Sequence, residues 1–241
     1  MRADPRRNEG DWAKSTLLGG LGEVDRRALL ATGTTTEYPG GKRLIEQGAE
    51  DDHAYLLVQG TVKVAARDPN GRSALLGIRL AGDLVGEMAA LDGSPAQHAP
   101  RSADVTTCGP VVARVIKAVE LHALMRRKPE ISLGVVRMVT SRLRWASERR
   151  VDVASRARAR VARILHEVVR DYGSSRATHW ELGVPLTQSE IASLSGVGLR
   201  TVQKSLRELA SAGVLVRKYG TIHVTDLDAL ARIAEVSSIP H

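Results

Sequence analysis

The alternation of hydrophobic and polar residues changes along the chain, and each change predicts a different kind of structure. Between Tyr38 and about Val119, short apolar runs such as AYLLVQG and TVKVAAR are separated by turn residues, among them the DPNG of Asp68–Gly71. Short strands divided by regularly spaced turns are typical of an antiparallel sandwich or barrel. Because Asn-Gly readily takes the positive φ angles of a tight turn, DPNG predicts a hairpin.

From Glu120 the apolar positions follow a helical period. One set of positions alternates spacings of four and three residues: Ser132, Val136, Val139, Leu143, Ala146, Arg150 and Val153. This is the heptad spacing through which two helices pair. A second face carries Ile131, Val135, Met138 and Trp145. We expect the second face to pack on its own domain and the seam to contact a second copy through Val136, Val139, Leu143, Ala146 and Val153. The alternative is that both faces lie in the core.

The segment Leu186–Leu215 predicts two short helices. Thr187 with Glu190 three residues later matches a capping box, and Gly196-Val197-Gly198 ends the first helix. Two β-type runs, VLVRK and TIHVT, then flank Tyr219-Gly220 and predict a small hairpin, or wing. Asp226 is expected to cap a last helix.

The second of these helices has two contrasting faces. Val202, Leu206 and Leu209 form an inward stripe, which leaves cationic and amide side chains outward. Such side chains suit base edges and phosphates, as on a recognition helix in the major groove. We expect Arg200, Gln203 and Lys204 to contact bases and Thr187, Ser189 and Arg207 to contact phosphates, with Leu199 and Thr201 also at the DNA. The alternative is a helical hairpin with a solvated basic face.

Composition supports an anionic partner. The formal charge is +8, which favours nucleic acid, although a basic soluble protein without such a partner has the same charge. Hydrophobic residues make up 43% of the chain and aromatic residues only 3%, so the cores must be aliphatic. The N-terminus reads as polar and charged, and we expect residues 1–16 to be a flexible tail. No signal peptide or long apolar stretch is present, so we expect a cytoplasmic protein with no membrane partner.

Candidate chemistry is sparse. The single cysteine, Cys108, excludes an internal disulfide and a cysteine-held iron–sulfur cluster within one chain. His53, His98 and His122 are scattered without the arrangement of haem ligands. There is no activated nucleophile, metal-ligand spacing or phosphate-binding loop. We therefore expect no enzyme activity, no catalytic residues and no metal site.

Taken in order, these pieces resemble the cyclic-AMP receptor / fumarate–nitrate regulator (CRP/FNR) family of bacterial transcription factors. The resemblance spans about residues 17–230. Its residues are YPGGKRLIEQG, YLLVQGTVKV, AGDLVGEMAALDG, PRSADV and LTQSEIASLSGVGLRTVQKSLRELASAGVL. Gly48, Gly60, Gly82 and Gly86 fit the glycine pattern of the family's β-roll, and the long helix resembles its dimerisation helix.

The resemblance implies an effector pocket in the β-roll. Its candidate residues are Gly86, Glu87, Met88, Arg101, Ser102 and Ala103, with Arg142 and Ser147 from the long helix. In the cyclic-nucleotide-binding members, the GE segment holds the ribose and the RSA segment grips the cyclic phosphate. Cyclic AMP or cyclic GMP is therefore the candidate effector. Alternatively, Glu87 and Arg101 pair with each other and only hold the loop.

Three positions depart from the cyclic-AMP-binding pattern. Ala146-Ser147 stands where a Thr-Ser pair is usual, DGSPAQHAP before Arg101 is longer than usual, and Leu199-Arg200 replaces the Arg-Glu that begins the recognition helix. We therefore do not expect the usual DNA site of the family. The first departure favours the alternative of a regulator that binds DNA without any effector.

The predicted architecture is α+β. It consists of a tail (1–16), a jelly-roll-like β-roll (17–124), a dimerisation helix with hinge (125–155) and a winged helix-turn-helix domain (156–241). The predicted function is a homodimeric, sequence-specific DNA-binding transcriptional regulator gated by a small effector. Its expected partners are double-stranded DNA, a second copy and, if it activates transcription, RNA polymerase.

Overall fold

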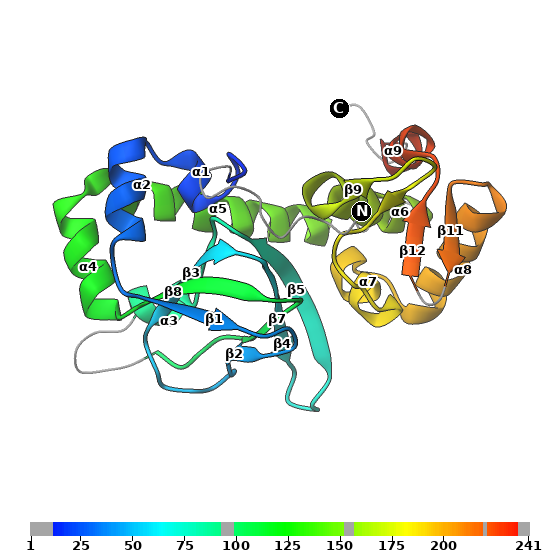
Figure 1. The fold of residues 1–241 in the computed structure, drawn as a ribbon. Helices are drawn as coiled ribbons and strands as arrows, with labels where there is room; N and C mark the ends of the chain where they lie inside the picture. Colours follow the sequence, from blue (N-terminus) through cyan, green and yellow to red (C-terminus); the bar gives the residue numbers. More distant parts are fainter. Residues whose placement is uncertain (1–11, 93–98, 152–156, 219–220, 236–241) are drawn as a thin grey trace. The chain divides into compact units, whose positions relative to one another are not determined.

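The computed structural model describes residues 12–92, 99–151, 157–218 and 221–235 (Figure 1). The described residues up to Leu143 form one compact unit, and those from Arg144 onward form a second. The first holds an antiparallel β domain with flanking helices, and the second holds a winged helix-turn-helix. The predicted α+β architecture is confirmed. The end of the predicted helix and hinge segment (125–155), and with it the boundary at 155/156, lies outside the described residues.

The β domain consists of two four-stranded antiparallel sheets. One has the order β1 (Thr34–Tyr38), β8 (Val111–Ile116), β3 (Ala54–Gln59) and β6 (Leu84–Val85). The other has the order β2 (Arg43–Ile45), β7 (Asp104–Thr107), β4 (Thr61–Arg67) and β5 (Ser73–Leu80). The DPNG turn joins β4 to β5, with Gly71 at φ +78° and the Asp68 carboxylate accepting from the backbone of Asn70 and Arg72. The predicted hairpin is confirmed.

Five helices accompany these sheets: α1 (Leu17–Gly20), α2 (Glu23–Leu30), α3 (Glu87–Asp92), α4 (Ala118–Arg127) and α5 (Pro129–Val151). The boundary that we expected at residues 124/125 falls within α4, which continues to Arg127, and the helical path breaks at Lys128. Pro129 explains the break: proline lacks a backbone N–H and is accepted in the first turn of a helix, where that donor is unpaired anyway.

The main core of the first unit is aliphatic, as the composition predicts. Leu18, Leu29, Leu56 and Leu121 are completely buried in it, together with Ile131 of α5. A Cβ atom at Gly134 would lie 3.0 Å from Leu17 Cδ1 and 3.1 Å from Leu21 Cδ2. Glycine at this position therefore allows the leucines around α1 to approach α5 closely.

Residues 12–16 differ from the expected flexible tail, whose other residues, 1–11, are not described. The Trp12 indole donates to the Val58 carbonyl at 3.2 Å. The Thr16 side chain is buried, and its hydroxyl accepts from Gly19 N at 3.2 Å as the cap of α1. A large aromatic ring and a helix cap explain why this polar-looking segment is ordered.

Besides the end of α5, the second unit contains four helices and a small sheet among its described residues. The helices are α6 (Ala157–Tyr172), α7 (Gln188–Ser195), α8 (Leu199–Ser211) and α9 (Leu227–Glu235). The sheet has the order β11 (Leu215–Lys218), β12 (Thr221–Val224), β10 (Trp180–Glu181) and β9 (Ser174–Ser175), all antiparallel. The β11–β12 hairpin confirms the predicted wing. The Asp226 carboxylate accepts from Ala229 N at 2.8 Å and caps α9 as expected.

Candidate DNA-binding surface and effector pocket

The first helix of the predicted pair begins and ends at the expected residues. The Thr187 hydroxyl accepts from Glu190 N at 3.2 Å, and the Glu190 carboxylate accepts from Thr187 N at 2.8 Å. Gly196 ends α7 with φ +62°, in the left-handed region that glycine enters without strain. The capping box and the glycine corner are therefore confirmed.

The following helix, α8, buries the predicted stripe. Val202, Leu206 and Leu209 have no exposed surface. Completely burying an aliphatic side chain of this size stabilises a fold by about 1.5–3 kcal/mol. The stripe therefore sets the rotation of α8 about its axis and determines which side chains face outward.

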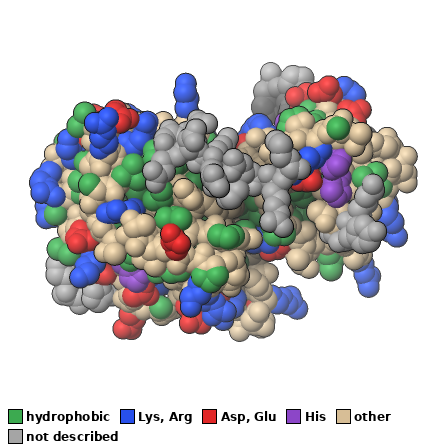
Figure 2. All heavy atoms as spheres, in the orientation of Figure 1, with side chains coloured by type: hydrophobic (Ala, Val, Ile, Leu, Met, Phe, Trp, Pro, Cys, Tyr) green, Lys and Arg blue, Asp and Glu red, His purple; other side chains and the backbone are tan. Residues whose placement is uncertain are grey.

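The outward face of α8 is cationic. Arg200, Gln203 and Arg207 are exposed, and they have no hydrogen bond or ion pair to any residue that the structure describes. Lys204 lies 3.9 Å from Glu208, an exposed pair of little energetic weight. Basic side chains (blue) project beside α8 in Figure 2. These donors remain available to an anionic partner.

The other residues predicted to contact DNA surround this face. Leu199 is 42% exposed, Thr201 is half-buried, and Thr187 and Ser189 are exposed at the start of α7. The Thr187 hydroxyl accepts its capping bond and can still donate. Arg217 of the wing, which was not among the predicted DNA contacts, is also exposed. The run VLVRK, with its arginine in a wing strand, was the signal for it.

In the β domain, Arg101 is buried and completes a local network. Its guanidinium donates to the Asp51 carboxylate, to the His53 carbonyl at 2.6 Å and to the Gly86 carbonyl at 3.0 Å. Only 3% of the residue is exposed. Because a buried cation must be paired, Arg101 joins the loop before β3 to the turn at Gly86.

Glu87 has a different partner. The Arg142 guanidinium of α5 donates to Glu87 Oε1 at 2.7 Å and to the Leu84 carbonyl at 2.9 Å, and it lies 3.5 Å from Asp83. The alternative in which Glu87 and Arg101 pair with each other is therefore wrong. Glu87 and Arg142, both predicted effector residues, instead join α3 to α5.

Burial and ion pairing shift several pKa values in this region. The hydrogen bond from Arg101 lowers the pKa of Asp51, and burial lowers the pKa of His53. Burial also raises the pKa of Asp83, against the opposing effect of Arg142. Asp51 is thus an ionised partner of Arg101 near neutral pH. Asp51 and His53 were not predicted as partners of Arg101. The acidic run EDDHA just before β3 was the only signal for them.

The remaining predicted effector residues are less closely connected. Met88 is 58% exposed, and the exposed Ser102 hydroxyl lies 3.4 Å from the Met88 sulfur. Ala103 is buried. Gly86 has φ +77°, and a Cβ there would lie 2.7 Å from Arg101 Nη1, so glycine is needed for the arginine to approach. Ser147 is exposed on the part of α5 that belongs to the second unit.

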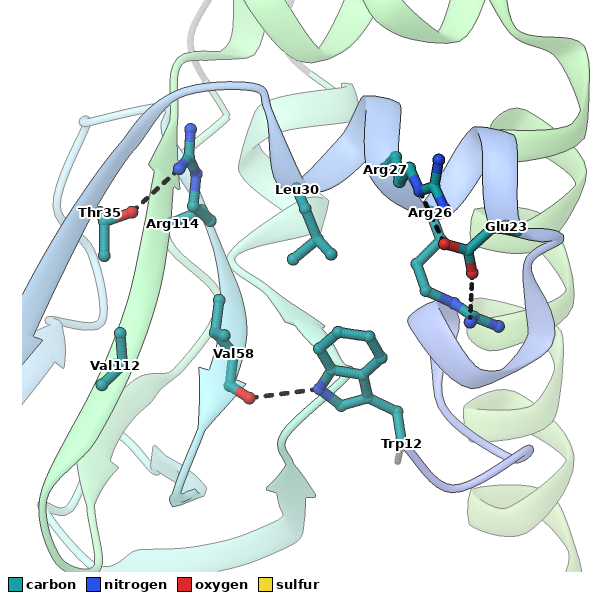
Figure 3. Close-up of a pocket in the computed structure, with 9 residues that line it drawn as sticks. All are labelled: Trp12, Glu23, Arg26, Arg27, Leu30, Thr35, Val58, Val112 and Arg114. Atoms are coloured by element: carbon teal, nitrogen blue, oxygen red, sulfur yellow. Dashed lines mark hydrogen bonds and ion pairs between the residues drawn. The ribbon is translucent and has the colours of Figure 1, made fainter. Parts of the chain in front are cut away.

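A separate cavity of about 350 Å³ lies in the first unit (Figure 3). Trp12, Leu30, Val58 and Val112 line it together with Glu23, Arg26, Arg27, Thr35 and Arg114. Its arginines are already engaged, since Arg26 and Arg27 bond to Glu23 and Arg114 bonds to Thr35. None of the predicted effector residues lines it.

The two faces of α5 differ as predicted. Ile131, Val135 and Met138 are buried in the core of their own unit, at 0%, 2% and 6% exposure. On the seam, Val136 is 59% exposed, Val139 38% and Leu143 66%. Ala146 is exposed as well, and Val153 lies outside the described residues. The alternative in which both faces are internal core is therefore wrong for the described part of one chain.

Known proteins share both parts of this arrangement. Residues 35–128 match the family model of a cyclic nucleotide-binding domain, and residues 159–233 match that of a Crp-like helix-turn-helix domain. The chain is 30% identical over 223 residues to a CRP-like cAMP-activated global transcriptional regulator of Mycobacterium tuberculosis, an alignment covering 92% of this chain and 97% of the relative. It is also 30% identical over 225 residues to the cyclic AMP receptor protein of Thermus thermophilus, covering 91% and 97%.

A solved structure has the same fold. A transcriptional regulator of the CRP/FNR family from Thermus thermophilus superimposes with a TM-score of 0.69 at 23% identity, over 84% of this chain and 98% of that one. The described helices include none with the length and apolar character needed to cross a membrane.

Proposed function

Since the chain belongs to the CRP/FNR family and is a DNA-binding transcriptional regulator, we propose that it acts as a homodimer whose two α8 helices enter successive major grooves of double-stranded DNA. The observation that carries this proposal is the outward face of α8, where Arg200, Gln203 and Arg207 are exposed and have no described partner. Two such helices related by a two-fold axis read half-sites about one helical turn, roughly 34 Å, apart.

We assign the contacts with DNA by the position of each side chain on α7 and α8. Arg200, Gln203 and Lys204 on the first turns of α8 contact base edges, with Leu199 and Thr201 beside them. Thr187, Ser189 and Arg207 contact phosphates. An unbiased selection from random duplexes tests this assignment: we expect a two-fold symmetric site. A selected pool without any common sequence would contradict sequence-specific recognition.

The second copy binds along the exposed seam of α5. Leu143 and Val136 expose most of their apolar side chains there, and a partner helix would cover them. Leu143→Glu places a charge on the seam and should convert the dimer into a monomer in sedimentation experiments. Ser141→Glu is the matched control, because Ser141 is exposed on another side of the same helix. Equal loss of dimer in both variants would contradict this interface.

A small anionic effector gates DNA binding through the β-roll. The curated relative from Mycobacterium tuberculosis is described as cAMP-activated, which supports a cyclic nucleotide here. In the structure the Asp51 carboxylate bonds to Arg101 in the way a phosphate oxygen would. A cyclic phosphate would displace Asp51, whose side chain is 40% exposed and can swing into water. The other candidate residues of the first unit complete the proposed site: Gly86, Glu87, Met88, Ser102, Ala103 and Arg142.

Calorimetry with cyclic AMP and cyclic GMP tests the effector. If Asp51 competes with the phosphate, Asp51→Ala should bind the nucleotide more tightly than the wild-type chain does. Asp92→Ala, an exposed carboxylate at the end of α3, is the matched control. DNA affinity should then depend on the nucleotide.

A second candidate is a regulator that binds DNA without an effector. The internal partners of Arg101 favour it, as does Ala146 in place of the hydroxyl residue usual in cyclic-AMP-binding members. Absence of nucleotide binding in wild type and in Asp51→Ala would establish this alternative. In both cases the chain is not an enzyme, works with the bacterial chromosome in the cytoplasm, and contacts RNA polymerase if it activates transcription.

A further inference from the structure

Three metal-ligating side chains lie on one face of the small sheet in the second unit. Strands β10 and β12 are antiparallel, with Glu181 directly opposite His223. His179 lies two residues before Glu181, so the two-residue period of an extended chain places its side chain on the same face. Opposite residues on neighbouring strands have Cβ atoms about 5 Å apart. The strand register therefore gathers an imidazole, a carboxylate and a second imidazole.

Their ligand atoms are close enough to share one ion. One ligand atom from each residue lies within 4.8 Å of the other two. His179 Nε2 is 3.9 Å from Glu181 Oε1, and the two imidazole rings are 4.5 Å apart between centroids at an interplanar angle of 79°. Ligands of a tetrahedral zinc ion with bonds of about 2.1 Å lie about 3.4 Å from one another. Small side-chain rotations are enough to reach that geometry.

Two of these ligand atoms lack a hydrogen-bond partner among the residues that the structure describes. His179 Nε2 and His223 Nδ1 are both buried and unpaired. Leaving a buried polar atom unpaired costs about 1–3 kcal/mol. Two such atoms side by side, with a carboxylate oxygen next to them, are hard to explain as core packing. A cation bound between them would satisfy both.

Neighbouring groups orient the ligands. The Thr178 hydroxyl lies 3.2 Å from His179 Nδ1, and a bond there leaves Nε2 as the ligand atom. Arg176 donates to Glu181 Oε2 at 2.7 Å, and Ser174 donates to the same oxygen at 3.4 Å, so Oε1 faces the histidines. The positive charge of Arg176 weakens the attraction for a cation. We therefore expect an affinity below that of a structural metal site with four protein ligands.

We infer that His179, Glu181 and His223 bind one divalent transition-metal ion of the zinc type. Two imidazole nitrogens and one carboxylate oxygen form a common zinc ligand set that leaves a fourth position for water or another donor. Magnesium and calcium prefer oxygen ligands throughout, so they bind poorly here. Histidine atoms (purple) are visible at the surface of the second unit in Figure 2.

The bound ion joins β10 to the wing. His223 belongs to β12 of the wing hairpin, whereas His179 and Glu181 belong to the segment before α7. Strands β10 and β12 pair through only two residues of each strand. A shared ion adds a further link between these two segments. Metal binding therefore stabilises the wing and its attachment to the rest of the second unit.

The first test measures metal binding by the full-length chain. Chelator-treated, dialysed protein competes with a chromophoric chelator for Zn²⁺, and Co²⁺ replaces Zn²⁺ for spectroscopy. We expect one bound ion per chain, the visible bands of a four-coordinate cobalt ion, and a midpoint of thermal unfolding raised by several degrees with Zn²⁺ but not with Mg²⁺.

Matched variants locate the site. His179→Gln and His223→Gln should each weaken Zn²⁺ binding at least about tenfold and abolish the cobalt bands. His166→Gln, on α6 of the same unit, should leave both unchanged. Glu181→Gln keeps the size of the side chain and should also weaken binding. Circular dichroism without metal establishes that each variant is folded.

Two results would overturn the inference. One is a wild-type chain that binds Zn²⁺ no better than the doubly substituted His179→Gln, His223→Gln chain. The other is a cobalt spectrum that persists in both folded single variants, because the ion would then be held elsewhere.

Discussion

Arg101 in the β domain and Arg200 on α8 have opposite surroundings. Arg101 is 3% exposed and donates to a carboxylate and two backbone carbonyls. Arg200 is exposed and has no partner among the described residues. A buried guanidinium must be paired because desolvation is costly, whereas an exposed one remains hydrated until a ligand replaces the water. A net charge of +8 therefore does not reveal which arginines meet an anion.

The largest expected effect is on stability. Arg101→Met removes the buried donor that Asp51, the His53 carbonyl and the Gly86 carbonyl share, so we expect a loss of about 3 kcal/mol in the free energy of unfolding. Urea unfolding of the full chain measures it. Arg43→Met is the control, because Arg43 is half exposed and pairs only with Glu46 at 2.8 Å among the described residues. The Arg43→Met substitution should change the free energy of unfolding by less than about 1 kcal/mol. Equal losses would remove the distinction between buried and exposed arginines.

The next effect is on sequence choice. Arg200→Met should lower affinity for the selected DNA site by about 1–3 kcal/mol and relax the preference at one base pair, because a bidentate contact to a base edge is lost. Stability should not change, since Arg200 has no partner in the described structure. Fluorescence anisotropy with the selected site and single-base variants measures it. An unchanged preference at every position would contradict a base contact.

A smaller and uniform effect is expected for the phosphate contact. Arg207→Met should weaken binding to all duplexes by a similar factor and reduce the slope of log affinity against log salt concentration by about 1. Titrations at several salt concentrations, with the selected and a random duplex, measure it. If Arg207→Met changed sequence preference as much as Arg200→Met, the division between base and phosphate contacts would be wrong.

The smallest effect concerns pH. The hydrogen bond from Arg101 lowers the pKa of Asp51 in the folded chain. Its contribution to stability is therefore present above the unfolded pKa of about 3.9 and is lost as pH falls through the folded value. Asp51→Asn should lower stability at pH 7 by less than about 1 kcal/mol, because the side chain is 40% exposed, and should flatten the loss of stability in acid. Unfolding curves at about pH 7 and below about pH 4 measure it, with Asp92→Asn as control.

The recognition helix shows which structural features a local sequence pattern can predict. Thr187 with Glu190 predicted where α7 begins, and Val202, Leu206 and Leu209 predicted which face of α8 is buried. Both features depend on residues within a turn or two of one another. The exposed face of α8 follows from the same period.

Other features could not be predicted in this way. Residues 12–16 looked like a tail because the Trp12 indole finds its partner at Val58, far along the chain. Glu87 was expected at an effector or paired with Arg101, whereas it bonds to Arg142 of α5. No local pattern indicates which of several acidic residues meets which arginine.

The sequence by itself determined the order of the elements, most of their ends and the buried face of each helix, because periodicity and caps act between near neighbours in the chain. The tertiary structure decided the partners of Arg101 and Arg142 and the meeting of His179, Glu181 and His223. Those contacts depend on strand register and on packing between distant segments. Only the folded backbone brings such side chains within bonding distance.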